Sequence, residues 1–118
     1  MQKSLLLIVD DWEALEVYED RLKNYFRIYS AAFGGEGIRI AQEVAVDRIL
    51  IDLTFEDMNA GEACEKLRSL PKTQNIPLTV IFNEDEKPFE KPGVFPLPAD
   101  QLHRRPYPFE RLLQELSK

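Results

Sequence analysis

Three short apolar runs constrain what this chain can fold into, because each has the length and composition of a buried strand. They occupy residues 5–9, 49–51 and 78–82. Continuous apolar runs of this length are typical of parallel sheets covered by helices on both faces. Asp10 and Asp11 follow the first run and Asp52 follows the second. We therefore expect these acids at the carboxyl ends of strands, where open α/β sheets build their binding sites.

Helical patterns separate the strand-like runs. Over residues 12–24 the stripe consists of Leu15, Tyr18 and Leu22, and similar stripes occur over 36–45, 60–70 and 108–118. Residues 25–29 alternate like a strand, and the glycine pair at 34–35 indicates a break before the second helix. Strands that alternate with helices predict a doubly wound α/β fold. We expect residues 1–118 to form a single domain.

The segment before the C-terminal helix does not fit this alternation. Prolines at 88, 92, 96 and 98 exclude a regular helix over residues 84–98, because an interior proline costs about 3 kcal/mol. An irregular, extended connection is expected there. The last strand is predicted at 101–104, and the more apolar residues 94–97 are the alternative, since an edge strand tolerates proline.

Composition excludes several classes of function. The formal net charge of −6 and a pI of about 4.8 argue against a nucleic-acid surface, which needs clustered lysine and arginine. The first apolar run is too short for a membrane span and lacks the features of a signal peptide. Cys64 is the sole cysteine and is expected in the core. A cytoplasmic protein without a membrane partner is predicted.

The three aspartates predict a cation site if their strands are neighbours. Carboxylates held about 5 Å apart repel by roughly 3 kcal/mol per pair at an effective dielectric near 20. Mg²⁺, a hard cation that prefers oxygen ligands, would relieve this repulsion. The alternative is that each acid begins a loop or caps the next helix, which is the common role of a lone aspartate at such a position.

The chain resembles the receiver domains of two-component response regulators. The similarity is carried by residues 5–11, by 47–52, by Met58-Asn59-Ala60 and by Arg105-Pro106-Tyr107. The resemblance implies a flavodoxin-like, five-stranded parallel sheet with strand order 2-1-3-4-5. The proline-rich stretch takes the place of the family's fourth helix, which is therefore expected to be degraded.

The resemblance also assigns roles to particular residues. Asp52 would be the phosphoacceptor, and Asp10, Asp11 and Asp52 would hold Mg²⁺ together with the backbone carbonyl of Thr54. The phosphoryl group would come from a sensor histidine kinase or a phosphotransfer protein. Arg105 stands in place of the family's lysine and keeps its positive charge.

Departures from the family pattern leave the mode of signalling open. Phe82 stands where the family has a threonine or serine that senses the phosphoryl group, and Leu102 replaces an aromatic residue that moves on activation. One reading is a receiver that is phosphorylated on Asp52 and signals through contact with a downstream protein. The alternative is a pseudo-receiver that docks partners regardless of phosphorylation. A Mg²⁺-dependent phosphohydrolase is disfavoured because Thr54 cannot act as a general acid, so no enzyme is expected.

Overall fold

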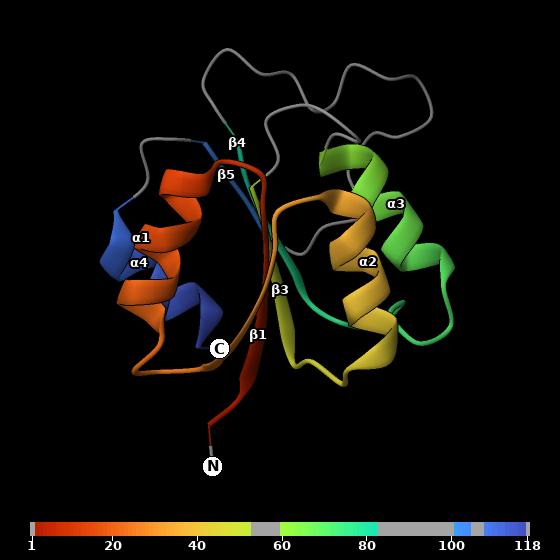
Figure 1. Ribbon diagram of the computed structural model, residues 1–118, viewed down its shortest axis with the longest axis horizontal. Coiled ribbons are helices and arrows are strands. Elements are labelled where there is room, and N and C mark those ends of the chain that lie inside the picture. Colours follow the sequence, from red (N-terminus) through yellow and green to blue (C-terminus); the bar gives the residue numbers. More distant parts are fainter. Residues whose placement is uncertain (1, 53–59, 83–100, 105–107, 118) are drawn as a thin grey trace.

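The computed structural model contains a parallel sheet with helices on both faces (Figure 1). It describes residues 2–52, 60–82, 101–104 and 108–117, with the backbone alone at 60, 82 and 101–104. The elements in chain order are β1 (Ser4–Val9), α1 (Trp12–Leu22), β2 (Arg27–Ala31), α2 (Gly34–Glu43), β3 (Arg48–Asp52), α3 (Ala60–Ser69), β4 (Leu78–Phe82), β5 (Gln101–Arg104) and α4 (Phe109–Leu116). The strands lie side by side in the order β2-β1-β3-β4-β5.

This arrangement confirms the doubly wound, flavodoxin-like α/β fold. All neighbouring strands pair in parallel, and β1 lies between β2 and β3. Strand β5 covers residues 101–104, the segment preferred from the sequence. The proline-rich residues 84–98 lie outside the described part of the chain, so the irregular connection and the degraded fourth helix stay predictions.

The side chains of β1 alternate between two hydrophobic layers. Leu5, Leu7 and Val9 pack in the layer that contains the buried residues of α1 and α4. Leu6 and Ile8 pack in the opposite layer, with residues of α2 and α3. Figure 1 shows α1 and α4 together on one side of the sheet and α2 and α3 on the other. Because both faces are covered, every β1 residue is buried, which explains the unbroken apolar run.

The starts of β2 and α2 differ from the sequence prediction. Strand β2 begins at Arg27 rather than at residue 25, because the amides of Tyr25 and Phe26 donate to the carbonyl of Leu22 at 3.0 and 3.1 Å and close the end of α1. Helix α2 begins at Gly34, so the glycine pair lies in its first turn and is not a break before it. The glycines therefore start the helix, with Phe33 at its N-cap position.

Ser4 and Asp47 join β1 to the turn before β3 at the amino-terminal end of the sheet. The Ser4 amide donates to Asp47 Oδ2 at 2.7 Å, and the Ser4 hydroxyl donates to the same oxygen at 3.1 Å. The hydrogen bond from the Ser4 amide, with a smaller contribution from the hydroxyl, lowers the pKa of Asp47 below its ordinary value although partial burial opposes the shift. This acid therefore has a structural role, at the end of the sheet opposite to Asp52.

Two expectations from composition can be compared with the structure. Cys64 is fully buried in the layer between the sheet and α2 and α3, as predicted for a core residue. Among the described residues, no helix combines the length and apolar character needed to cross a membrane.

Candidate functional site

The carboxyl ends of β1 and β3 lie side by side, which brings two of the predicted aspartates together in the backbone. Val9 of β1 is the register partner of Asp52 of β3. One residue later, the Asp10 amide donates to the Asp52 carbonyl at 3.4 Å. This hydrogen bond joins the residue that follows β1 to the last residue of β3. The sheet therefore places the acidic ends of two strands, distant in the sequence, at one edge.

Asp52 is almost completely buried and its side chain is engaged by a tyrosine. Only 2% of the residue is exposed. Leu50, two residues earlier on β3, belongs to the layer that contains α1, and alternation along a strand places Asp52 on the same face. The hydroxyl of Tyr18, on α1, donates to Asp52 Oδ2 at 2.9 Å. A buried carboxylate requires such donors, because unpaired charge is costly away from water.

Asp11 has the capping role that was the alternative interpretation of the acidic pair. It is the N-cap of α1, and its Oδ1 accepts a hydrogen bond from the Glu13 amide at 3.2 Å. Its own carbonyl accepts the Leu15 amide at 2.9 Å, which starts the helical hydrogen-bond series. A carboxylate at this position also interacts favourably with the positive end of the helix dipole. Asp10 is half-buried, and Asp11 is exposed.

The donors suit Mg²⁺ chemically, but their side chains are not gathered around one point. Asp10, Asp11 and Asp52 supply only carboxylate oxygens, the ligands that a hard cation prefers. Among the described residues, however, no three histidine, cysteine, aspartate or glutamate side chains are close enough to hold a metal ion. The backbones of the acidic residues lie close together, but their side chains have other partners. The Asp11 carboxylate accepts a hydrogen bond from the Glu13 amide, and the Asp52 carboxylate accepts one from the Tyr18 hydroxyl. Binding would therefore require a local change of side-chain conformation.

The remaining predicted site residues are only partly covered by the structure. Thr54 and Arg105 lie outside the described residues. Phe82 is the last residue of β4 and pairs with Arg104 of β5, so its backbone lies at the carboxyl ends of the strands. The side chain of Phe82 is not described. The roles assigned to these three residues remain predictions.

Sequence reasoning assigned Tyr18 only to the apolar stripe of α1. The structure confirms that its ring packs with that layer, since Tyr18 contacts the cluster containing Leu15 and Leu22. Its hydroxyl, however, reaches the candidate phosphoacceptor. The available signal was the residue type itself, because a buried tyrosine hydroxyl usually finds a hydrogen-bond partner. Which partner it finds depends on how α1 packs on the sheet.

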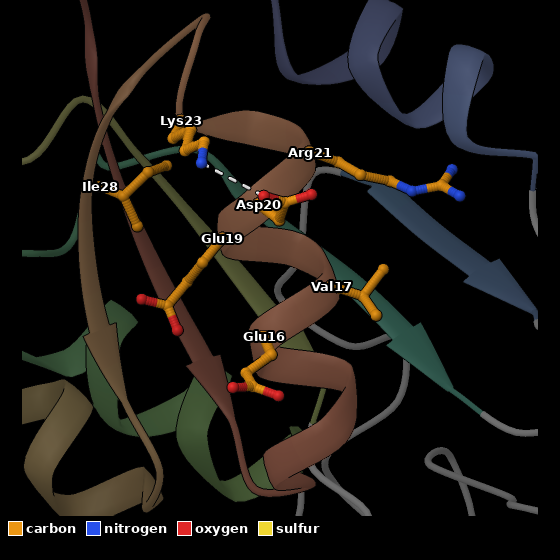
Figure 2. Close-up of a pocket in the computed structure, with 7 residues that line it drawn as sticks. All are labelled: Glu16, Val17, Glu19, Asp20, Arg21, Lys23 and Ile28. Atoms are coloured by element: carbon orange, nitrogen blue, oxygen red, sulfur yellow. Dashed lines mark ion pairs between the residues drawn. The ribbon is translucent and has the colours of Figure 1, made fainter.

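A separate hollow on the outer face of α1 contains none of the predicted site residues. Figure 2 shows its lining, which is mainly charged: Glu16, Val17, Glu19, Asp20, Arg21, Lys23 and Ile28. Lys23 Nζ and Asp20 Oδ1 form an ion pair at 3.2 Å, and both side chains are mostly exposed. Such a pair contributes little to stability. The hollow is therefore a mainly charged surface formed by α1 and β2.

Comparisons with known proteins agree with the geometry. No protein-family model matches the sequence. The chain is 27% identical over 107 residues to Histidine kinase P4 of Formosa agariphila, a match that covers 90% of this chain and 8% of that protein. It is 32% identical over 78 residues to Response regulator PleD of Caulobacter vibrioides, covering 64% of this chain and 17% of the relative. The chain thus spans a small part of each of these relatives.

Solved structures with the same fold include single receiver domains. The chemotaxis protein CheY4 of Vibrio cholerae superposes with a TM-score of 0.84 at 20% identity, covering 99% of this chain and 98% of that one. The receiver domain of sensor histidine kinase PA1611 from Pseudomonas aeruginosa, solved with magnesium coordinated in its active site cleft, gives 0.80 at 17% identity, covering 99% and 96%. The fold is that of a receiver domain.

The resemblance to response regulator receiver domains is therefore confirmed. The parallel sheet with helices on both faces, the solved structures of the same fold and the sequences of the relatives all support this resemblance.

Proposed function

We propose that this chain is a receiver module of a two-component system in which Asp52 accepts a phosphoryl group. The position of Asp52 carries the proposal. Asp52 is the last residue of β3, and its backbone carbonyl accepts a hydrogen bond from the amide of Asp10, which follows β1. Asp52 is almost completely buried. The fold shared with receiver domains supports this assignment. The donor would be a sensor histidine kinase or a phosphotransfer protein.

The chemistry proposed for Asp52 is a displacement at phosphorus. One carboxylate oxygen forms a bond to the phosphorus atom of a phosphohistidine while the bond from phosphorus to the imidazole nitrogen breaks. The electron pair of that bond stays with the nitrogen, and the product is an acyl phosphate on Asp52. Such transfers depend mainly on positioning and on electrostatic stabilisation. The fixed backbone of β3 supplies the positioning of the attacking group.

We propose that Mg²⁺ binds to Asp10, Asp11 and Asp52 and to the carbonyl of Thr54. When bound, the cation supplies positive charge that offsets the charge on the phosphoryl oxygens. The chain binds the cation through carboxylate oxygens. The Asp11 carboxylate must then either lose its hydrogen bond from the Glu13 amide or interact with the amide and the cation at once. Arg105 is proposed to pair with the charge at Asp52 in place of the family's lysine.

The output is proposed to be a contact with a downstream protein, within the cytoplasm and without nucleic acid or membrane. A module that docks regardless of phosphorylation is the second candidate. Phe82 favours it, because β4 ends on this residue where the family has a hydroxyl that bonds the phosphoryl oxygen. Losing a hydrogen bond to a charged acceptor removes about 1.5–3 kcal/mol of preference for the phosphorylated state. Both candidates are signalling modules rather than enzymes.

Phosphorylation by a small donor tests the first candidate. The protein is incubated with acetyl phosphate and Mg²⁺, and the covalent phosphoryl group is measured by intact-protein mass spectrometry. We expect labelling of the wild type and of Asp47→Asn, and none of Asp52→Asn. Asp47 is a matched control, because it lies just before β3 whereas Asp52 ends that strand. Equal labelling of all three proteins, or of none, contradicts the assignment of Asp52.

Amide NMR with beryllofluoride, a phosphoryl mimic, separates the two candidates. A phosphorylation-dependent switch should shift resonances at the end of β4 and along β5 (Gln101–Arg104), beyond the pocket itself. Shifts confined to residues near Asp10 and Asp52 would instead support docking without a phosphorylation signal.

A further inference from the structure

The hydrogen bond between Tyr18 and Asp52 joins a helix to the candidate phosphoacceptor inside the protein. Tyr18 is in the middle of α1, and its hydroxyl donates to Asp52 Oδ2 at 2.9 Å. Asp52 is only 2% exposed, so water has little access to replace this donor. Hydrogen bonds to a charged acceptor in such surroundings are stronger than neutral ones. The contact therefore stabilises the Asp52 carboxylate in its present orientation.

The same contact helps to explain why the acidic side chains are not gathered in this structure. Oδ2 of Asp52 is engaged by the phenol, and Oδ1 of Asp11 is engaged by the Glu13 amide. No group of three candidate ligands is formed among the described residues. A cation approaching Oδ2 must share that oxygen's lone pairs with the phenol proton. The Tyr18 hydroxyl and a cation therefore compete for Asp52 Oδ2.

We propose that Tyr18 is a positioning residue that holds Asp52 in a resting state and competes with the divalent cation for its carboxylate. This inference rests on the proposed function of Asp52. Tyr18 has room to withdraw, because a hollow of about 320 Å³ between α1 and α4 is lined by Tyr18, Val17, Ile81 and Phe109, among others. This hollow is the space into which the ring would move on leaving Asp52.

The hydrogen bond also lowers the reactivity of Asp52. In the attack on acetyl phosphate, a carboxylate oxygen bonds to phosphorus, the bond from phosphorus to the acetyl oxygen breaks, and acetate leaves with the electron pair. The side chain of Asp52 loses its negative charge as the acyl phosphate forms. The carboxyl oxygen that does not bond to phosphorus then accepts a weaker hydrogen bond from the Tyr18 hydroxyl. An interaction that is stronger in the ground state than in the transition state slows the reaction.

Tyr18→Phe tests this by removing the hydroxyl and keeping the ring. Mg²⁺ affinity is measured from the fluorescence of Trp12, which follows Asp11 and is 68% exposed. We expect Mg²⁺ to bind about fivefold more tightly and acetyl phosphate to react about fivefold faster, each equivalent to about 1 kcal/mol. Tyr29→Phe is the matched control, since Tyr29 is a half-buried tyrosine on β2 that packs in the opposite layer. It should change neither quantity.

The direction of the change separates competition from a merely structural role. A tyrosine that only supports the fold would, when altered, weaken Mg²⁺ binding or leave it unchanged. Weaker or unchanged binding by Tyr18→Phe therefore overturns the proposal. In an Asp52→Asn background, Tyr18→Phe should not change the affinity for Mg²⁺. An equal gain in Mg²⁺ affinity in that background would also contradict the proposed competition.

A measurement on the wild-type protein avoids dependence on the variant. The carbon-13 resonance of the Tyr18 Cζ atom should shift when Mg²⁺ is added, because its hydroxyl loses Asp52, while the Tyr29 resonance should not. Absence of this shift at saturating Mg²⁺ overturns the proposal. If Asp52 takes no phosphoryl group in any variant while Tyr18→Phe still binds Mg²⁺ more tightly, the competition stands and the phosphoacceptor assignment fails.

Discussion

Gly37 is required where α2 crosses β1, and replacing it with alanine should destabilise the protein. A Cβ atom at this position would lie 2.5 Å from both Cδ1 and Cγ1 of Ile8 and 3.0 Å from its Cγ2. These distances are well below van der Waals contact. Ile8 is fully buried and cannot move away without disturbing its own neighbours. The close approach of helix and strand therefore leaves no space for a methyl group.

Two opposing terms determine the size of this effect. Alanine is favoured over glycine within a helix by about 0.8–1.0 kcal/mol. Overpacking a well-packed core typically costs 1–3 kcal/mol, and three close contacts with one rigid, branched side chain place this site in the upper part of that range. The unfavourable term is larger, so we expect Gly37→Ala to lower the free energy of unfolding by about 1–2 kcal/mol.

Urea denaturation followed by circular dichroism measures this change. Gly35→Ala is the control, because Gly35 is an exposed residue of the same helix and should be neutral or slightly stabilising. Ile8→Ala removes the atoms that clash, at its own cost of about 2–5 kcal/mol. In that background the clash is absent, so Gly37→Ala should stabilise the protein by the helix-propensity difference of about 0.8–1.0 kcal/mol, which gives a coupling free energy of about 2–3 kcal/mol. A Gly37→Ala protein as stable as the wild type would refute this account of α2 packing.

Two further predictions concern polar contacts away from the candidate site. Because the pKa of Asp47 is lowered in the folded state, its contribution to stability is complete above its ordinary value of 3.8 and is lost as the pH falls through the lower, folded value. Asp47→Ala should therefore lose less stability than the wild type on acidification below about pH 4, and parallel urea midpoints for the two proteins would contradict this. The fully buried Thr73 donates its hydroxyl to the Leu67 carbonyl, whose helical partner four residues later would be Pro71, which has no amide hydrogen. Thr73→Val should lower the free energy of unfolding by about 1–3 kcal/mol and Thr73→Ser by less, whereas equal losses would show that the hydroxyl is unimportant.

The sequence predicted the layout of the fold well because burial leaves a strong local signal. An apolar run such as residues 5–9 can be accommodated only where both faces of a strand are covered, and the structure buries every one of these residues. Boundaries were less predictable. Tyr25 and Phe26 have the alternation of a strand, yet their amides close the end of α1. Backbone hydrogen bonds of this kind depend on how the preceding helix ends, which residue type alone does not specify.

The amino-acid sequence by itself determined that the chain forms a doubly wound α/β fold and that Asp10 and Asp52 follow buried strands. Only the tertiary structure decided where the side chain of Asp52 is directed and what it contacts. The reason is that periodicity assigns a residue to a face of its own element, whereas a contact requires two elements to be packed in a particular register. The register of β3 beside β1, with α1 packed on β1, brings the hydroxyl of Tyr18 to Asp52.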